Sequence, residues 1–486
     1  MKLILEGNIN KTYVQTLCMM FFHGEKFPLN NENEKNYIKV MQTEDNEKLS
    51  VLCTLCYNEK IVQGSAIAYR TSTESYERTS KTAVGKAVYQ AGREITGKDV
   101  PWGILTGIRP SKVAYEYLKH QSIDNAKNVL LDKYLLSSTK ADLCLDVAKN
   151  EYSIINQYSD KTCSIYISIP FCPTRCTYCS FISYATQKLF DLIPDYIQAI
   201  KRELLNKVTI INNLGLEIVS LYIGGGTPTT LNSNQLEELL TYINSCLNVK
   251  ALKEFTVECG RPDTINKEKL EILEKYGVNR ISVNPQTLND DVLHQIGRKH
   301  TVDDFLKAYT LAKDNTNLTI NVDLIAGLEG DSFDSFKNTI DRIIELKPHN
   351  ITVHSFSVKK SAQALVDDKS IYELNGEFAE KSVNYAYDTI RNHNYMPYYM
   401  YRQKNTIADL ENVGYSKEGY FSIYNILMMS DCHTVFGIGA GASTKLVKNV
   451  CGKNEILRIF SHKYPYEYLK DEKDKTQEIV VFFKEV

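Results

Sequence analysis

The sequence has no apolar run long enough to cross a membrane, and its charges nearly cancel. A transmembrane helix needs about 20 consecutive apolar residues. The 57 basic and 59 acidic side chains leave a net charge of −2 at neutral pH. Proteins that bind nucleic acids or acidic lipid surfaces usually carry an excess of positive charge. The sequence therefore gives no indication of a membrane span or of a nucleic-acid or lipid partner.

The first residues, MKLILEGNINK, also lack the apolar core of a signal peptide. Without an export signal, the 12 cysteines favour a reducing cytosol over a disulfide-rich secreted protein. The length of 486 residues corresponds to about three domains of ordinary size. We therefore expect a cytoplasmic globular protein with several domains.

Three cysteines stand close together after a short apolar, alternating segment. Residues 164–181 read SIYISIPFCPTRCTYCSF, in which Cys172, Cys176 and Cys179 form a C-x3-C-x2-C pattern. Closely spaced thiolates on one loop can bind an iron–sulfur cluster. Three thiolates leave one iron of a four-iron cluster without a protein ligand, and an open metal position is where substrate chemistry takes place. A zinc site or three unrelated thiols are the alternatives, but no histidine lies at a similar spacing.

From Ser164 onward, predicted strands and helices alternate. Six strands are predicted, at Ile165–Ile169, Ile218–Ile223, Glu254–Glu258, Arg280–Val283, Leu318–Ile325 and Asn350–Phe356. Helical patterns fill the intervals, at Ile193–Val208, Ser233–Cys246, Lys267–Tyr276, Val302–Asp314 and Ser332–Leu346. Six successive β/α units predict an α/β fold in which a parallel sheet curls into a partial (β/α)6 TIM-like barrel. The active site of such a barrel lies at the carboxyl ends of its strands.

The residues that follow these strands are polar or rich in glycine. GGGTPTT at Gly224–Thr230 allows backbone amides to approach a ligand closely. Glu258 ends the third strand, and a carboxylate there suits a cationic ammonium group. The later strand ends add Gln286, Arg298, His300 and Asp323. The arginine suits a carboxylate, and the histidine suits a helix-capping or surface role as well as a role in the site. Polar residues at successive strand ends indicate a binding site, although each alone would suit a solvated loop.

Residues 1–160 are predicted to form an N-terminal α+β domain. Antiparallel strands are expected at Tyr37–Met41, Leu49–Cys56 and Lys60–Tyr69, followed by helices at 78–95, 110–119, 123–135 and 139–157. Cys53 and Cys56 point to opposite faces of a strand, so we expect buried core thiols instead of a metal site. The segment Val100–Lys112 holds the single tryptophan, Trp102, with Arg109 nearby. A basic, glycine-rich turn before a helix could bind an anion, but we favour a packing element.

Residues 361–486 are predicted to form a C-terminal α+β extension, with a helical pattern at Tyr372–Asn392. Aromatic and basic side chains in the segment YMPYYMYRQKN could line a flat pocket, and the candidates are Tyr398, Tyr399, Tyr401 and Arg402. An edge strand packed on the barrel is the alternative. The glycine-rich segment Gly437–Ser443 could close the pocket or contact a cofactor.

The cysteine pattern resembles that of the radical S-adenosylmethionine (SAM) superfamily. Further motifs resemble the HemZ-type members of the oxygen-independent coproporphyrinogen III oxidase family, also called coproporphyrinogen dehydrogenase. These motifs are WGILTGIRP at Trp102–Pro110, VECGRPDT at Val257–Thr264 and YRQKN at Tyr401–Asn405. The resemblance covers essentially the whole chain and is strongest from Ser164 to about Leu446. It implies a radical SAM barrel at 161–360, an N-terminal domain at 1–160 and a substrate-pocket region at 361–486.

The resemblance also implies the cofactors. Cys172, Cys176 and Cys179 would hold a [4Fe-4S] cluster, and SAM would bind beside it. The family's SAM contacts match Tyr166, Tyr178, Gly224, Gly225, Gly226, Thr227, Glu258, Gln286, Arg298 and Asp323. A flavodoxin- or ferredoxin-type donor would reduce the cluster, which would pass one electron to SAM. The resulting 5′-deoxyadenosyl radical would take a hydrogen from a propionate β-carbon, and loss of carbon dioxide and an electron would leave a vinyl group.

Three departures from the family pattern bear on the substrate. Decarboxylating members have a cysteine where this chain has Phe181, and a histidine where it has Ser168. Phe181 matches the haem-chaperone branch. The N-terminal domain of about 160 residues is also longer than in the well-understood enzymes. We therefore consider three functions: conversion of coproporphyrinogen III to protoporphyrinogen IX, a haem chaperone, and a radical SAM enzyme acting on another tetrapyrrole.

Overall fold

A computed structural model describes the chain except for residues 23, 24, 26, 28–33, 73, 180–182, 358–375, 404, 405, 451, 452, 471–475, 485 and 486. The chain divides into two compact units. Unit 1 comprises Met1–Lys149, Asp367–Glu377 and Met400–Leu410, and unit 2 comprises Asn150–Val366, Phe378–Tyr399 and Glu411–Val486. The division into three domains at residues 160 and 360 stays a prediction.

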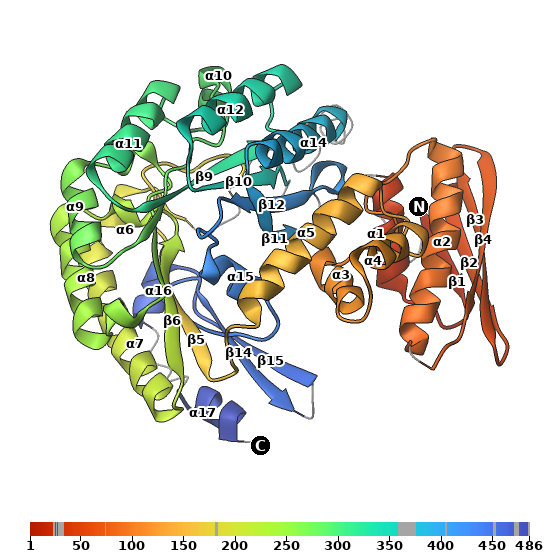
Figure 1. Cartoon of the computed structure of the whole chain (residues 1–486), viewed down its shortest axis with the longest axis horizontal. Helices are drawn as coiled ribbons and strands as arrows, with labels where there is room; N and C mark the ends of the chain where they lie inside the picture. The colour runs from red at the N-terminus through yellow and green to blue at the C-terminus, as the bar shows by residue number, and fades with distance from the viewer. Residues whose placement is uncertain are drawn as a thin grey trace. The chain divides into compact units, whose positions relative to one another are not determined.

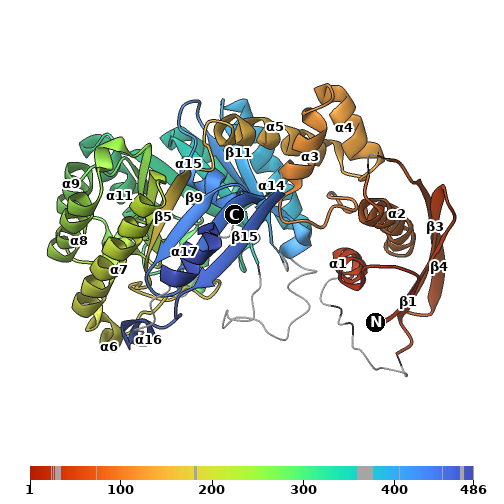
Figure 2. The same ribbon diagram turned by 90° about the horizontal axis from the view of Figure 1, so that it is seen from below.

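Unit 1 contains a four-stranded sheet with the order β1-β2-β3-β4. Its strands are β1 (Lys2–Glu6), β2 (Tyr37–Glu44), β3 (Lys48–Tyr57) and β4 (Lys60–Tyr69). The antiparallel pairing of β2, β3 and β4 confirms the prediction, whereas β1 was not predicted and pairs with β2 in parallel. The helices are α1 (Lys11–Phe21), α2 (Tyr76–Thr96), α3 (Pro110–Leu118), α4 (Ile123–Asp132) and, across the unit boundary, α5 (Ser138–Ile155). Helices α1 and α2 lie on the same face of the sheet (Figure 2).

Buried positions in unit 1 settle two of the sequence predictions. Cys53 is fully buried and Cys56 is 8% exposed, so both are core thiols as expected. The side chain of Trp102 is 1% exposed, which agrees with its interpretation as a packing residue.

Unit 2 contains the β/α units, and the sheet they form has eleven strands among the described residues. The strand order is β11-β12-β10-β9-β8-β7-β6-β5-β13-β14-β15. The six predicted strands are β5 (Thr162–Ile169), β6 (Glu217–Gly225), β7 (Glu254–Glu258), β8 (Arg280–Ser282), β9 (Thr319–Ala326) and β10 (Asn350–Ser355). They are parallel and adjacent in chain order, which confirms the predicted topology.

The C-terminal region extends this sheet at both edges. Its strands are β11 (Met396–Arg402), β12 (Glu411–Ser416), β13 (Thr434–Ile438), β14 (Ser443–Val450) and β15 (Lys453–Phe460). Strand β13 adds to β5 in parallel, and β12 adds to β10 in the antiparallel direction. Among the described residues, β11 and β15 are the outermost strands of this sheet.

Alternation along the parallel strands gives the sheet one apolar and one polar face. Positions such as Ile165, Leu221 and Phe255 are fully buried on the apolar face. The polar face carries Ser164, Tyr166 and Ser168 in β5, Ser220 and Tyr222 in β6, Glu254, Thr256 and Glu258 in β7, Arg280 and Ser282 in β8, Asn321 and Asp323 in β9, and Asn350, Thr352 and His354 in β10. Because side chains alternate between faces, this pattern directs one whole face of polar groups to the inside of the curved sheet.

Helices cover the apolar face (Figure 1). They are α7 (Ile193–Asn213), α8 (Ser233–Cys246), α9 (Lys267–Lys275), α11 (Val302–Asn315) and α12 (Phe333–Leu346), with the short helices α6 (Gln187–Phe190) and α10 (Asp290–Gln295) between them. Capping boxes fix the starts of two of them, with Asn232 and Gln235 at α8 and Thr301 and Asp304 at α11.

The C-terminal region adds α14 (Gly376–Asn392), α15 (Ile423–Met429), α16 (Pro465–Lys470) and α17 (Thr476–Lys484). Helix α15 lies inside the curve of the sheet, against its polar face (Figure 1). None of the helices in the described ranges combines the length and hydropathy that a membrane crossing requires.

Candidate functional site

The loop that carries the three cysteines leaves β5 at the carboxyl end of the sheet. Cys172 and Cys176 are each 8% exposed, Cys179 is half-buried, and none forms a disulfide. Within the described ranges, no three His, Cys, Asp or Glu side chains, these cysteines included, converge on a point that could hold one metal ion. A cubane cluster does not need such convergence, because each thiolate binds a different iron.

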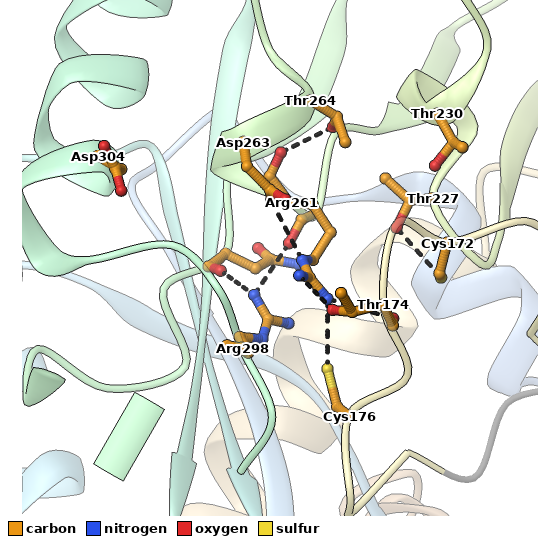
Figure 3. A network of polar contacts seen from close by, with 12 residues as sticks. Cys172, Thr174, Cys176, Thr227, Thr230, Arg261, Asp263, Thr264, Arg298 and Asp304 are labelled. Atoms are coloured by element: carbon orange, nitrogen blue, oxygen red, sulfur yellow. Dashed lines mark hydrogen bonds and ion pairs between the residues drawn. The ribbon is translucent and has the colours of Figure 1, made fainter. Parts of the chain in front are cut away.

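Polar groups contact two of the sulfurs (Figure 3). Thr227 Oγ1 lies 3.3 Å from Cys172 Sγ, and Arg261 Nη1 donates a hydrogen bond to Cys176 Sγ over 3.5 Å. Burial raises the pKa of Cys172 to about 11, so without iron this thiol keeps its proton at neutral pH. Metal binding releases such a proton because the thiolate is the ligand. Soft thiols on one loop, with hydrogen-bond donors at their sulfurs, fit an iron–sulfur cluster.

The glycine turn at the end of β6 packs against the cysteine loop. Gly226 N and Thr227 N donate to the carbonyls of Ile169 and Phe171 over 2.9 and 2.8 Å. A Cβ at Gly226 would lie 2.7 Å from the Phe171 oxygen. Gly225 has a φ of +106°, which favours glycine. The turn therefore requires glycine both for close approach and for its backbone conformation.

Glu258 lies beneath this turn. It accepts hydrogen bonds from the Tyr222 hydroxyl over 2.5 Å and from Gly225 N over 3.2 Å. Burial, with a smaller contribution from the charge of Asp323, raises the pKa of Glu258 to about 7. Among the described residues, no basic side chain forms an ion pair with this carboxylate. A buried carboxylate of this kind attracts a cationic ligand, because a nearby positive charge stabilises its ionised form.

Gln286, which follows β8, and Asp323, which lies within β9, are brought together. Gln286 N donates to the Asp323 carbonyl over 3.1 Å, and Gln286 has a positive φ of 71°. Its side-chain Oε1 is buried without a hydrogen-bond partner. Asn284 and Asn321 donate to the two carboxylate oxygens of Asp323 over 2.8 and 2.7 Å. A strained backbone and an unpaired buried acceptor are typical of functional positions.

Arg298 connects the β7 and β8 ends with the cysteine loop. Its Nη1 donates to the carbonyls of Gly260 and Asn284 over 3.2 and 2.7 Å. Its Nε and Nη2 donate to the Tyr178 hydroxyl over 3.2 and 3.1 Å. The two predicted SAM contacts Tyr178 and Arg298 are thus direct partners.

His300 is 3% exposed, and the N-cap residue of α11 is Thr301, so neither a surface nor a capping role is correct. A role in the site stays a prediction. Both ring nitrogens are buried without hydrogen-bond partners. Burial and the nearby charges of Arg298 and Arg261 lower the pKa of His300 to about 4, which leaves the ring neutral at neutral pH.

The segment Gly437–Ser443 packs on the end of β5. Ser168 Oγ donates to the Ala440 carbonyl over 2.8 Å, and a Cβ at Gly439 would lie 2.8 Å from the Ser168 oxygen. Ser168, at the position where the resemblance implies a histidine in decarboxylating members, therefore makes a backbone contact. Phe181 lies outside the described residues.

The four substrate candidates all lie in β11, an edge strand of the sheet, and their described contacts are packing contacts. Tyr398 is 1% exposed and stacks on Phe421 at 5.1 Å, and the ring of Tyr399 packs against Gly414. Arg402 belongs to unit 1, where its guanidinium lies 5.1 Å from the Trp102 ring and donates to Leu105 O and Asp409. Tyr401 is half-buried in the same unit. These contacts favour the edge-strand alternative, and a substrate role for the four stays a prediction.

Sequence reasoning missed several residues at this end of the sheet. Tyr222 was one of them: it is the register partner of the predicted residue Tyr166 and stacks on it at 6.0 Å, and strand alternation places both on the face that carries Glu258. That alternation was a usable signal. Tyr424 stacks on Tyr222 at 4.4 Å from α15, and nothing local in the sequence indicated it. Arg261 lies in the quoted motif VECGRPDT but received no role, and Asn284, directly after the predicted strand Arg280–Val283, was not singled out.

Comparisons with known proteins agree with this arrangement. The Radical SAM superfamily model matches residues 166–343. The oxygen-independent coproporphyrinogen-III oxidase-like protein HemZ of Bacillus subtilis is 35% identical over 423 residues, which are 86% of this chain and 83% of the relative. The heme chaperone HemW of the same species is 31% identical over 62% of this chain and 77% of the relative.

Two further proteins are more distantly similar. The oxygen-independent coproporphyrinogen III oxidase of Escherichia coli is 27% identical over 42% of this chain and 44% of its own length. The solved structure of coproporphyrinogen III oxidase (HemN) from Escherichia coli covers 70% of this chain and 72% of its own, with 19% identity and a TM-score of 0.49.

Proposed function

Because the chain belongs to the HemZ family of oxygen-independent coproporphyrinogen-III oxidase-like proteins, within the radical SAM superfamily, we propose that it oxidatively decarboxylates the propionates of coproporphyrinogen III. The product would be protoporphyrinogen IX. One observation carries the proposal: the cysteine loop, the glycine turn and Glu258 are joined by direct contacts at the carboxyl end of the sheet. This is where a barrel enzyme of this class places its reaction.

As a radical SAM protein, the chain uses a [4Fe-4S] cluster and SAM. When bound, they supply a carbon-centred radical that takes a hydrogen atom from the substrate. We assign the cluster to Cys172, Cys176 and Cys179, because these three thiols share one loop that is docked on the glycine turn.

The remaining predicted side chains would bind SAM. The ionised form of Glu258 attracts the methionine ammonium, and the amides of the glycine turn lie beside it. Arg298 holds Tyr178 and directs a permanent positive charge towards the methionine carboxylate. Gln286 and Asp323 would face the nucleoside, where the unpaired Gln286 Oε1 accepts a hydrogen bond. These residues orient SAM and exclude water, and hydrogen abstraction needs no general base from the chain.

The reaction is tested by reconstituting the protein anaerobically with iron and sulfide, reducing it with dithionite and adding SAM and coproporphyrinogen III. Mass spectrometry should detect protoporphyrinogen IX together with 5′-deoxyadenosine, and the Cys176→Ser variant should produce neither. Formation of 5′-deoxyadenosine without a porphyrin product would overturn the substrate assignment and favour another tetrapyrrole.

A haem chaperone is the second candidate, since HemW of Bacillus subtilis is 31% identical over 77% of its length. A sample with a full, reducible cluster that forms neither product but binds haem stoichiometrically would support it. In either case we place the protein in the cytoplasm with a flavodoxin- or ferredoxin-type partner as the electron donor.

A further inference from the structure

Arg261 is a buried arginine to which neither the fold nor the SAM site assigns a role. It follows β7, directly before a single 3-10 turn at Pro262–Thr264, and it is 3% exposed. An arginine keeps its charge in every protein environment, so this position brings a permanent positive charge into the interior. Such a charge requires acceptors close by.

The acceptors belong to the cysteine loop and to one neighbouring carboxylate (Figure 3). Arg261 Nη2 donates to Thr174 Oγ1 over 2.7 Å, and Nη1 donates to Thr174 O over 3.4 Å. The same Nη1 donates to Cys176 Sγ over 3.5 Å. On the other side, Nε lies 3.3 Å from Asp263 Oδ1. The guanidinium thus connects Thr174 and Cys176 of the cysteine loop with Asp263.

The segment Ile296–Gly297 also contacts the cysteine loop. Thr174 Oγ1 donates to Gly297 O over 3.4 Å, and Thr177 N donates to Ile296 O over 3.1 Å. A Cβ at Gly297 would lie 3.3 Å from Arg175 O, so the loop packs closely on this glycine. The backbone contacts fix the position of the loop, and Arg261 adds the charge.

We propose that Arg261 is a positioning residue for the cluster that raises its reduction potential by placing a positive charge at Cys176 Sγ. The inference rests on the proposed function only in requiring the cluster at these cysteines. Reduction adds one electron from the flavodoxin- or ferredoxin-type donor, or from dithionite, and makes the cluster more negative. Hydrogen bonds to cluster sulfurs and nearby positive charge stabilise that state.

The charges of the residues around Arg261 determine in which direction each substitution should shift the reduction potential. Arg298 contributes a second positive charge on the same side, whereas neutral His300 contributes none. Asp263, whose side chain is 30% exposed, partly offsets the charge of Arg261. Removing Arg261 and removing the charge of Asp263 should therefore move the potential in opposite directions, which a general loosening of the site would not do.

The test is an anaerobic redox titration of the reconstituted protein without substrate, in which electron paramagnetic resonance measures the reduced cluster. At a fixed potential near the wild-type midpoint, Arg261→Gln should lower the ratio of reduced to oxidised cluster about tenfold, which corresponds to about 59 mV for one electron. Asp263→Asn should raise the ratio, by a smaller factor of about two to three because Asp263 is partly exposed. Arg261→Lys, which keeps the charge, should remain within about twofold of wild type.

A full cluster in Arg261→Gln with an unchanged or raised potential would overturn the inference. If Arg261→Gln binds no cluster, the redox titration of Asp263→Asn tests the inference in its place. A ratio of reduced to oxidised cluster that is lowered or unchanged in Asp263→Asn would then overturn the inference. A wild-type protein that binds no cluster at all would instead contradict the cluster assignment on which the proposed function depends.

Discussion

Strand β7 carries a buried glutamate at each end, and their environments differ. Glu254, at the start of the strand, is 3.4 Å from Arg280 Nε and accepts hydrogen bonds from Ser422 Oγ and from the first amides of α15. Glu258, at the end, accepts from a tyrosine and one amide, and within the described ranges it has no basic partner. The pKa of Glu258 is raised to about 7 by its burial.

The two glutamates lie on the same face of β7, but Glu254 has a structural role and we propose a binding role for Glu258. Glu254 neutralises Arg280 and caps α15, the helix that fills the inside of the curved sheet. Glu258 has no basic partner among the described residues, and we propose that its ionised form binds a ligand. The glutamate at the amino end is thus satisfied by the protein itself, whereas we propose that a cofactor completes the site at the carboxyl end.

The largest expected effect is at the carboxyl end, on removal of a cluster ligand. Cys176→Ser should lower the yield of 5′-deoxyadenosine from SAM more than 100-fold, beyond the roughly 10- to 100-fold loss typical of an outer contact. Iron and sulfide analysis should show loss of the cluster, while circular dichroism should show a folded protein. A variant that retains the cluster and cleaves SAM would contradict the ligand assignment.

At the amino end, Glu254→Gln should affect stability and leave the binding site intact. The change leaves the buried Arg280 without its carboxylate, which typically costs about 3–5 kcal/mol. Urea unfolding should show the loss as a lower midpoint with an unchanged slope. The remaining folded protein should bind SAM with wild-type affinity, and weakened binding would mean that the two ends are coupled.

Glu258→Gln is the matched substitution at the carboxyl end of β7. In contrast to Glu254→Gln, it should weaken SAM binding and leave stability unchanged. We expect SAM to bind about 10- to 100-fold more weakly, because a hydrogen bond between charged groups is worth about 1.5–3 kcal/mol. Stability in urea should not fall, since the variant removes a buried charge that has no partner. Equilibrium dialysis against SAM measures the first effect, and equal affinities in variant and wild type would remove Glu258 from the SAM site.

A smaller effect is expected from a change of pH, which should alter the affinity for SAM. The ammonium of SAM requires ionised Glu258, and in the SAM-free protein this group gains a proton as the pH falls through about 7. Binding should therefore release a proton at low pH, and the dissociation constant should be about tenfold higher at pH 6 than at pH 8. Calorimetry between pH 6 and pH 8 should show this pH dependence of the dissociation constant in wild type and not in Glu258→Gln. The same pH dependence in both proteins would assign the titration to another group.

The parallel strands were predictable because each alternates between apolar and polar residues and ends at a turn or a glycine. The predicted range Glu254–Glu258 is the observed strand β7, and Ser233–Cys246 is the observed helix α8. Strand β1 was missed because it is short and none of its residues reaches full burial. Strand β13 was not predicted, although its last residues belong to the glycine-rich segment Gly437–Ser443, and its parallel pairing with β5 depends on a contact distant in sequence.

The candidate cofactor residues were predictable for a related reason. Parallel strands place their carboxyl ends at one edge, so polar residues after successive strands are brought together by the topology alone. Glu258 and the glycine turn meet as that rule requires. The substrate candidates followed no such rule. Arg402 lies in another unit from Tyr398, and which partner a buried aromatic or arginine finds depends on packing that no local pattern encodes.

The sequence by itself determined the order of the β/α units, the polar face of the sheet and the cysteine loop at its carboxyl end. These follow from local periodicity and from the chemistry of side chains at fixed spacing. Only the tertiary structure distinguished Glu254 from Glu258 and gave Arg261 its contact with Cys176 Sγ. The reason is physical: a carboxylate or guanidinium takes its role from the charges and donors around it, and long-range folding supplies these.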